Sequence, residues 1–150
     1  MLSENRSAAL IALESNTPGI LKIGGRPYRG ALSFIADGSR LLVINVVEME
    51  DYIKGVVPEE ISTKAPIEAL KAQAVAARTF AFFGKAINKS RFYDLESTTT
   101  SQVYGGASAE RTNTNRAVDE TDGLVLTFEG KPILAQFHGN CGGHTEDCEK

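Results

Sequence analysis

The sequence predicts an α+β fold, a single domain in which antiparallel β hairpins form a small meander packed on one long central helix. Three observations predict it. Residues 19–47 contain short apolar and β-branched runs separated by tight-turn residues. An alanine-rich segment of helical character follows at residues 66–83, and residues 124–137 return to the hairpin pattern.

The composition is that of an ordinary globular protein. Hydrophobic residues make up 42% and charged residues 23% of the 150 residues, which is enough for one core. The net charge of −3 excludes nucleic-acid binding as the main task, and no apolar window is long enough to span a bilayer. Residues 1–18 lack the basic and apolar regions of a signal peptide, so we expect an N-terminal extension before a domain at residues 19–150.

The first hairpins are predicted by their turns. Gly24-Gly25 follows the apolar run at residues 20–23 and favours a tight turn. Asp37-Gly38 separates the runs at residues 28–35 and 40–47, and this dipeptide is typical of a two-residue hairpin. Together these runs predict a small antiparallel meander.

The helical part of the chain comes next. Apolar residues at three-to-four spacing predict a short helix over residues 48–54 that ends at Gly55. Residues 56–58 should then be extended, because proline restricts the residue before it. Proline in the first turn and high alanine content predict a long helix over residues 66–83, which Gly84 loosens or ends.

The rest of the chain is less regular. Residues 90–113 are polar and carry no clear period. A second short helix is predicted at residues 114–122, with Gly123 beyond its end. Residues 124–128 and 132–137 predict another hairpin.

Six segments of the chain carry recognisable motifs: DYIKGVVPEEI at 51–61, EALKAQAVAARTF at 68–80, YDL at 93–95, SQVYGG at 101–106, AVDET at 117–121 and GGHTE at 142–146. In this order they resemble the SpoIID/LytB domain family, and the resemblance covers about residues 20–147. Domains of that family continue well past the last segment, so the resemblance implies a domain that is incomplete at its C-terminus. The family's N-terminal anchor is missing as well, and a location outside the cytoplasm, at the cell wall, follows from the resemblance alone.

The resemblance implies lytic transglycosylation of peptidoglycan glycan strands that have lost their stem peptides, in wall remodelling or sporulation. Its catalytic glutamate corresponds to Glu60. Some members are described instead as enhancers of a cell-wall amidase, so an amidase or endopeptidase is an expected partner beside the glycan strands. The positions that match the family's substrate cleft are Lys71, Gln73, Arg78, Ser101, Gln102 and Tyr104.

A single glutamate is sufficient for this chemistry. In lytic cleavage the nucleophile is the C6 hydroxyl of the muramic acid itself, so one carboxyl group serves first as acid and then as base, with no cofactor. Apolar neighbours and the like charge of Glu59 both favour the protonated form of Glu60 that an acid needs. The local sequence fits equally an exposed acidic pair ahead of a helix. The resemblance is what favours the catalytic role.

Two cations lie on the long helix. Lys71 and Arg78 are two turns apart, so they project from nearly the same face and suit the lactyl carboxylates of peptide-free muramic acid. A solvated polar stripe, or a pair of Lys71 with Glu68, fits the same pattern. Gln73 lies at a different angle around the helix and fits a structural role as well.

The loop residues Ser101, Gln102 and Tyr104 suit hydrogen bonds to sugar hydroxyls, and the tyrosine ring suits stacking on a sugar. A turn that satisfies its own polar groups explains the same residues. Both interpretations stay open at this point.

All the cysteines and histidines of the chain fall in one short tail. His138, Cys141, His144 and Cys148 make a complete tetrahedral zinc set, although the spacing is not that of a standard zinc finger. With four protein ligands such a zinc would be structural. A Cys141–Cys148 disulfide, or partial ligation completed from outside the chain, remains an alternative.

Overall fold

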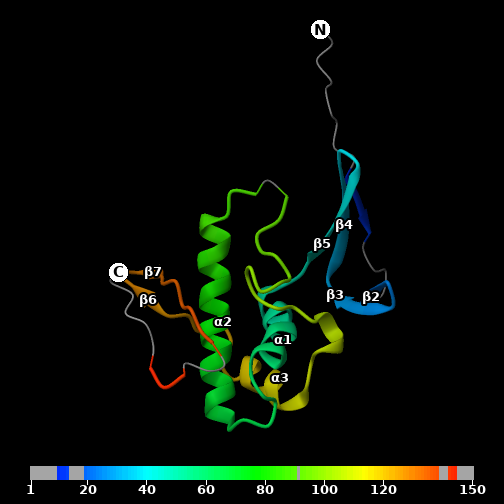
Figure 1. Cartoon of the computed structure of the whole chain (residues 1–150). Coiled ribbons are helices and arrows are strands. Elements are labelled where there is room, and N and C mark those ends of the chain that lie inside the picture. Colours follow the sequence, from blue (N-terminus) through cyan, green and yellow to red (C-terminus); the bar gives the residue numbers. More distant parts are fainter. Residues whose placement is uncertain (1–9, 14–18, 91, 139–141, 145–150) are drawn as a thin grey trace.

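The computed structural model describes residues 10–13, 19–90, 92–138 and 142–144. The strands are β1 (Leu10–Leu13), β2 (Ile20–Ile23), β3 (Arg26–Arg29), β4 (Ala31–Asp37), β5 (Arg40–Val46), β6 (Thr127–Phe128) and β7 (Lys131–Pro132). The helices are α1 (Met49–Glu60), α2 (Ile67–Ile87) and α3 (Thr112–Asp119), with a 3₁₀ turn, η1 (Gly106–Ser108), before α3. The three α-helices lie together, and the β1–β4–β5 sheet extends away from them (Figure 1). The α+β prediction is therefore confirmed.

Both N-terminal hairpins form where the turns predicted them. β2 pairs with β3 across Gly24-Gly25, and β4 pairs with β5 with Asp37 opposite Arg40. The glycines of these turns take positive φ angles, which side chains with a Cβ rarely adopt. One strand has no counterpart in the sequence predictions: β1, inside the predicted N-terminal extension, pairs antiparallel with β4. The C-terminal hairpin also forms, but its strands β6 and β7 are shorter than predicted.

The helix boundaries differ from the prediction at two glycines. The expected end of α1 at Gly55 is wrong, because the helix continues through Gly55 and Pro58 to Glu60. Burial outweighs the weak helix formers: Val56 and Val57 are fully buried in the core between them. α2 likewise passes through Gly84 and ends at Ile87. The first correction makes Glu60, which lay outside every predicted element, the last residue of a helix.

Small side chains let the three helices approach closely. The fully buried core consists of Ile53, Val56 and Val57 from α1, Ala74, Ala77 and Ala81 from α2, and Val118 from α3. The alanines of α2 lie on one helical face, as their three-to-four spacing requires. This face is the reason that the alanine-rich segment lies at the centre of the helical group.

The β-strands are joined to the helical group by an ion pair. Arg29 of β3 donates to both oxygens of Glu110, at 2.6 and 2.9 Å, and Asn115 adds a third hydrogen bond at 3.0 Å. Burial alone would raise the pKa of Glu110, but the hydrogen bonds from Arg29 and Asn115 outweigh it and lower the pKa below its ordinary value.

The lowered pKa of Glu110 makes its stabilising effect dependent on pH. A carboxyl group with a lowered pKa in the folded state stabilises the fold fully above its unfolded pKa of ~4.3, and this contribution is lost as the pH falls through the folded value. Glu110→Gln should therefore cost about 1 kcal/mol at pH 7 and progressively less below pH ~4. Thermal unfolding of both proteins from pH 7 to pH 3 checks this. A deficit that stays constant over that range would contradict it.

Candidate functional site

Glu60 is held by the backbone of a distant loop. It is the last residue of α1 and is half-buried. The N–H of Val103 donates to its Oε1 at 3.0 Å. Within the described part of the chain, the structure gives its second oxygen no hydrogen-bond donor. One oxygen is thus fixed while the other is left to interact elsewhere.

The loop that carries Val103 is fastened to two helices. Gln102 is 1% exposed, accepts a hydrogen bond from the Tyr52 hydroxyl at 3.1 Å and donates to the carbonyl of Ala77 at 3.1 Å. Gly105 donates to the carbonyl of Gly55 at 3.0 Å. The side chain of Gln102 is therefore occupied inside the protein, and the structure does not present it to a ligand.

Tyr104 joins the loop to the β-strands. Its hydroxyl donates to the Asn45 side chain at 2.9 Å, and the Asn45 amide donates to the carbonyls of Arg29 and Ala31. Its ring lies 5.0 Å from that of Tyr52, centroid to centroid. Burial raises the pKa of Tyr104 to about 12 and raises that of Tyr52 as well, so both phenols stay neutral donors at neutral pH.

The expected pair of cations does not face a common groove. Arg78 is fully buried and donates to both oxygens of Glu50, at 2.8 and 2.6 Å. It also donates to the carbonyls of Leu124 and Val118. The guanidinium therefore joins α1, α2 and the chain after α3, and has no exposed surface for a sugar carboxylate.

Lys71, by contrast, keeps some exposure. Its side chain is 26% exposed, and it forms ion pairs with Glu68 at 2.9 Å and Glu120 at 2.8 Å. Hydrogen bonds to Glu120 and Glu68 raise the pKa of Lys71. The pair with Glu68 is the alternative that helical spacing had left open.

The two remaining substrate candidates differ in what they contact. The Ser101 hydroxyl accepts the N–H of Glu96 at 3.2 Å, as in a turn that satisfies its own polar groups. The side-chain nitrogen of Gln73 is buried and has no hydrogen-bond partner among the residues the structure describes. Neither the hydrogen bond of Ser101 nor the unpartnered nitrogen of Gln73 indicates a ligand by itself.

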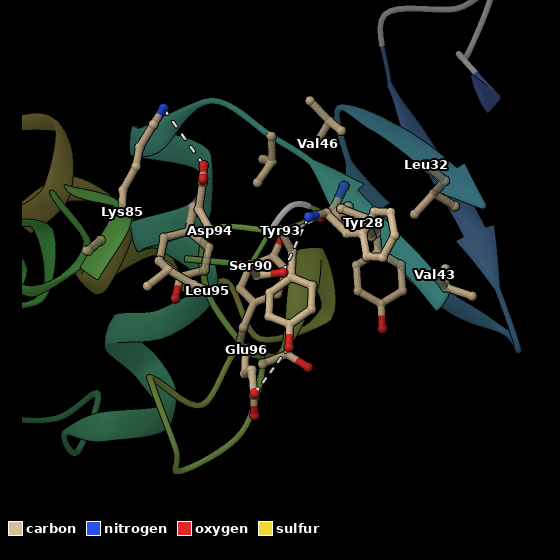
Figure 2. Close-up of a pocket in the computed structure, with 18 of the residues that line it drawn as sticks. Tyr28, Leu32, Val43, Val46, Lys85, Ser90, Tyr93, Asp94, Leu95 and Glu96 are labelled. Carbon is tan, nitrogen blue, oxygen red and sulfur yellow. Dashed lines mark hydrogen bonds and ion pairs between the residues drawn. The ribbon is translucent and has the colours of Figure 1, made fainter. Parts of the chain in front are cut away.

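A cavity of about 970 Å³ opens between β5 and the segment after α2. Figure 2 shows Tyr28, Val43 and Val46 on the strand side of this cavity, facing Tyr93, Asp94 and Glu96 of the segment. Of the predicted site residues that the structure describes, only Tyr104 lines it. Glu60 does not line the cavity wall. It is linked to the wall through Val103, which binds its carboxyl group and precedes Tyr104 in the loop.

The predicted zinc ligands lie only partly within the described residues. His138 and His144 are exposed, whereas Cys141 and Cys148 lie outside the described ranges. In those ranges no three His, Cys, Asp or Glu side chains are arranged to hold a metal. The zinc site and its alternatives stay predictions.

Sequence reasoning missed the residues that hold the site together. Asn45 could have been found, because it interrupts the apolar run of β5. The signals for Tyr52 and Glu50 were weaker. Tyr52 matched an apolar position of the helix, and Glu50 matched the acidic first turn that is common in helices. Their roles depend on partners far along the chain.

Comparison with known proteins gives the family. The sequence model of SpoIID, described as "Stage II sporulation protein", matches residues 37–128, which include Glu60 and Tyr104. The chain belongs to the SpoIID family. The family that we inferred from six ordered segments is therefore confirmed. No helix among the described residues of this SpoIID-family chain is long and apolar enough to cross a membrane.

Curated relatives extend the match beyond the family model. An uncharacterized protein of Brachyspira hyodysenteriae is 38% identical over 162 residues, which cover 99% of the chain and 43% of that protein. The Amidase enhancer of Bacillus subtilis is 37% identical over 87% of the chain and 18% of its own length. Stage II sporulation protein D of the same species is 34% identical over 69% of the chain and 34% of its own length. The chain therefore spans less than half of each of these relatives.

Proposed function

We propose that this SpoIID-family chain carries the catalytic core of a peptidoglycan lytic transglycosylase, acting at the cell wall on peptide-stripped glycan strands. The observation that carries the proposal is the hydrogen bond from Val103 to one oxygen of Glu60. A backbone N–H can bind that oxygen whether the carboxyl group is protonated or ionised, so the group keeps one orientation through both halves of the reaction.

The proposed reaction uses this carboxyl group twice. Protonated Glu60 gives its proton to the glycosidic oxygen as the bond to C1 of the muramic residue breaks. The carboxylate then takes the proton of the C6 hydroxyl as that oxygen bonds to C1. The products are a 1,6-anhydro-muramic end and a free hydroxyl on the leaving sugar, and Glu60 is protonated again. Neither water nor a cofactor takes part.

Among the substrate candidates, Lys71 and Tyr104 suit the proposal best. Lys71 is partly exposed, so it can turn from Glu120 toward a lactyl carboxylate. Tyr104 lines the cavity and is next in sequence to Val103, which holds the acid; its hydroxyl already donates to Asn45, so its ring is the part that suits contact with a sugar. Arg78 is left out, since its charge is already neutralised inside the protein.

The test is Glu60→Gln assayed on purified peptide-free glycan strands. Glutamine keeps an oxygen for the Val103 N–H but cannot donate an acidic proton, so release of anhydro-muramic products should fall by at least ~100-fold while the fold is retained. Mass spectrometry of the products measures it. Glu129→Gln makes the same chemical change at an exposed position in the turn between β6 and β7, and as the control it should keep activity within about twofold. Full activity of Glu60→Gln would show that another group is the acid.

A second candidate function follows from one relative. The Bacillus subtilis protein named Amidase enhancer is 37% identical to this chain. A non-catalytic enhancer would bind glycan and raise the turnover of a separate cell-wall amidase without making anhydro products. The same mass spectrometry separates the two, because an amidase releases peptides and leaves the sugar chain intact.

A further inference from the structure

The strand β5 has an open edge. The order in its sheet is β1-β4-β5, and among the residues described no backbone hydrogen bond joins the outer side of β5 to another segment. A two-residue turn closes the hairpin at Asp37 and Arg40, and hydrogen-bonded pairs alternate from there. The backbone groups of Leu41, Val43 and Asn45 therefore point away from β4, to the open edge.

The cavity of about 970 Å³ runs along this edge. Its wall includes every residue from Leu42 to Val47. Consecutive strand residues face opposite sides of a sheet, so a cavity lined by all of them follows the strand edge. Leu32 of β4 also lines the cavity, which therefore reaches one face of the sheet as well. Ser90 and residues 92–98 form the opposite wall. The five residues of β5 in this wall, Leu42 to Val46, extend ~17 Å, the length of one short peptide strand.

The walls indicate the chemistry of an occupant. Val43 is 45% and Val46 56% exposed, so apolar side chains are available for contact. Among the lining residues that the structure describes, the carboxylates of Glu48, Asp94 and Glu96 outnumber the one cation, Lys85. Lys85 forms an ion pair with Asp94 at 3.8 Å. Figure 2 marks this pair with a dashed line, and the described part of the lining keeps an excess of negative charge.

We propose that this cavity is a docking groove for an extended peptide segment of a partner protein, which adds to β5 as a further antiparallel or parallel strand. The open N–H and C=O groups of β5 recognise an extended backbone, as in strand-addition complexes. Val43 and Val46 lie on opposite faces of the strand, so each offers an apolar contact to one face of the added strand. The carboxylates select a lysine or arginine. Glu60 does not line the groove, but the groove wall includes Asn45, Tyr52 and Tyr104, whose contacts hold the loop that binds Glu60.

Binding of a defined probe tests the proposal. The probe is a fluorescein-labelled heptapeptide with valine and threonine alternating between two terminal lysines, titrated against the whole chain in an anisotropy assay. Saturable binding with Kd below about 1 mM is expected. The same peptide with terminal glutamates should bind at least ~10-fold more weakly, because it meets the carboxylates. Equal binding of the two peptides, or none of either, would overturn the proposal.

Two proline variants test the edge itself. Val43→Pro removes an N–H that points to the groove and leaves the β4–β5 hydrogen bonds in place, so probe affinity should fall ~10-fold. Leu41→Pro, on the same edge but outside the cavity lining, is the matched control and should stay within about twofold. Circular dichroism confirms the fold of each variant; should Val43→Pro not fold, the two-peptide comparison on the unmodified chain decides.

Other occupants give different results. A second copy of the chain would appear as a dimer in analytical ultracentrifugation that Val43→Pro abolishes. A carbohydrate would appear as displacement of the probe by a GlcNAc tetramer. Either result would overturn the proposal of a peptide groove, and neither depends on whether Glu60 is catalytic.

Discussion

Arg78→Met should lower the free energy of unfolding by about 3 kcal/mol, measured by urea denaturation. The substitution leaves Glu50 without the bidentate partner that it contacts at 2.8 and 2.6 Å. It also removes the donor to the carbonyls of Leu124 and Val118. The Glu50 side chain is 28% exposed and can partly rehydrate, so we expect the low end of the range for broken buried pairs.

Two variants separate burial from charge as the cause. Arg116→Met removes an arginine that is 66% exposed and pairs with Glu120 on the surface, and should cost under ~0.5 kcal/mol. Adding Glu50→Met to Arg78→Met should recover part of the loss, since an apolar pair leaves no uncompensated charge. A cost below ~1 kcal/mol for Arg78→Met alone would contradict the structural role.

Gly55→Ala should destabilise the protein by up to about 2 kcal/mol and reduce lytic activity with it. A Cβ at this position would clash with Tyr104 Cε2 and lie 2.9 Å from Tyr104 Cδ2 and 3.2 Å from the carbonyl of Gly106. The overpacking costs ~1–3 kcal/mol of stability, and the higher helix propensity of alanine offsets ~1 kcal/mol of that cost. Displacing Tyr104 also moves Val103 and its hydrogen bond to Glu60. Denaturation and product release are both measured.

Gly84→Ala is the matched control for that substitution. It makes the same chemical change in the interior of α2, where a Cβ would meet only Leu95 Cδ2, at 2.7 Å. That atom ends a flexible side chain and can move. The gain in helix propensity should then leave stability unchanged or raised by up to ~1 kcal/mol, with activity retained. If both alanines behaved alike, the contact of Gly55 with Tyr104 would not be the cause.

Local patterns in the sequence were sufficient for most of the secondary structure. The turns at Gly24-Gly25 and Asp37-Gly38 fell where glycine was needed for a positive φ. The boundary error at Gly55 has a specific origin: this glycine looked like a helix end, but its missing Cβ makes room for Tyr104. A residue 49 positions away along the chain cannot be seen in a local window.

The predicted site residues show the same contrast between a local sequence pattern and a long-range contact. Lys71 and Arg78 share a helix face by spacing, yet one is 26% exposed and the other fully buried. Helical geometry predicts the direction of a side chain, but what covers that direction depends on other segments.

By itself, the sequence determined the α+β class, the hairpins, the long helix and the SpoIID family, because each depends on short-range periodicity or on the order of motifs. Only the tertiary structure decided that Arg78 is buried with Glu50, and that Val103 anchors Glu60. These pairs are 28 and 43 residues apart, and burial, partner and charge balance are properties of segments that meet only when the chain is folded.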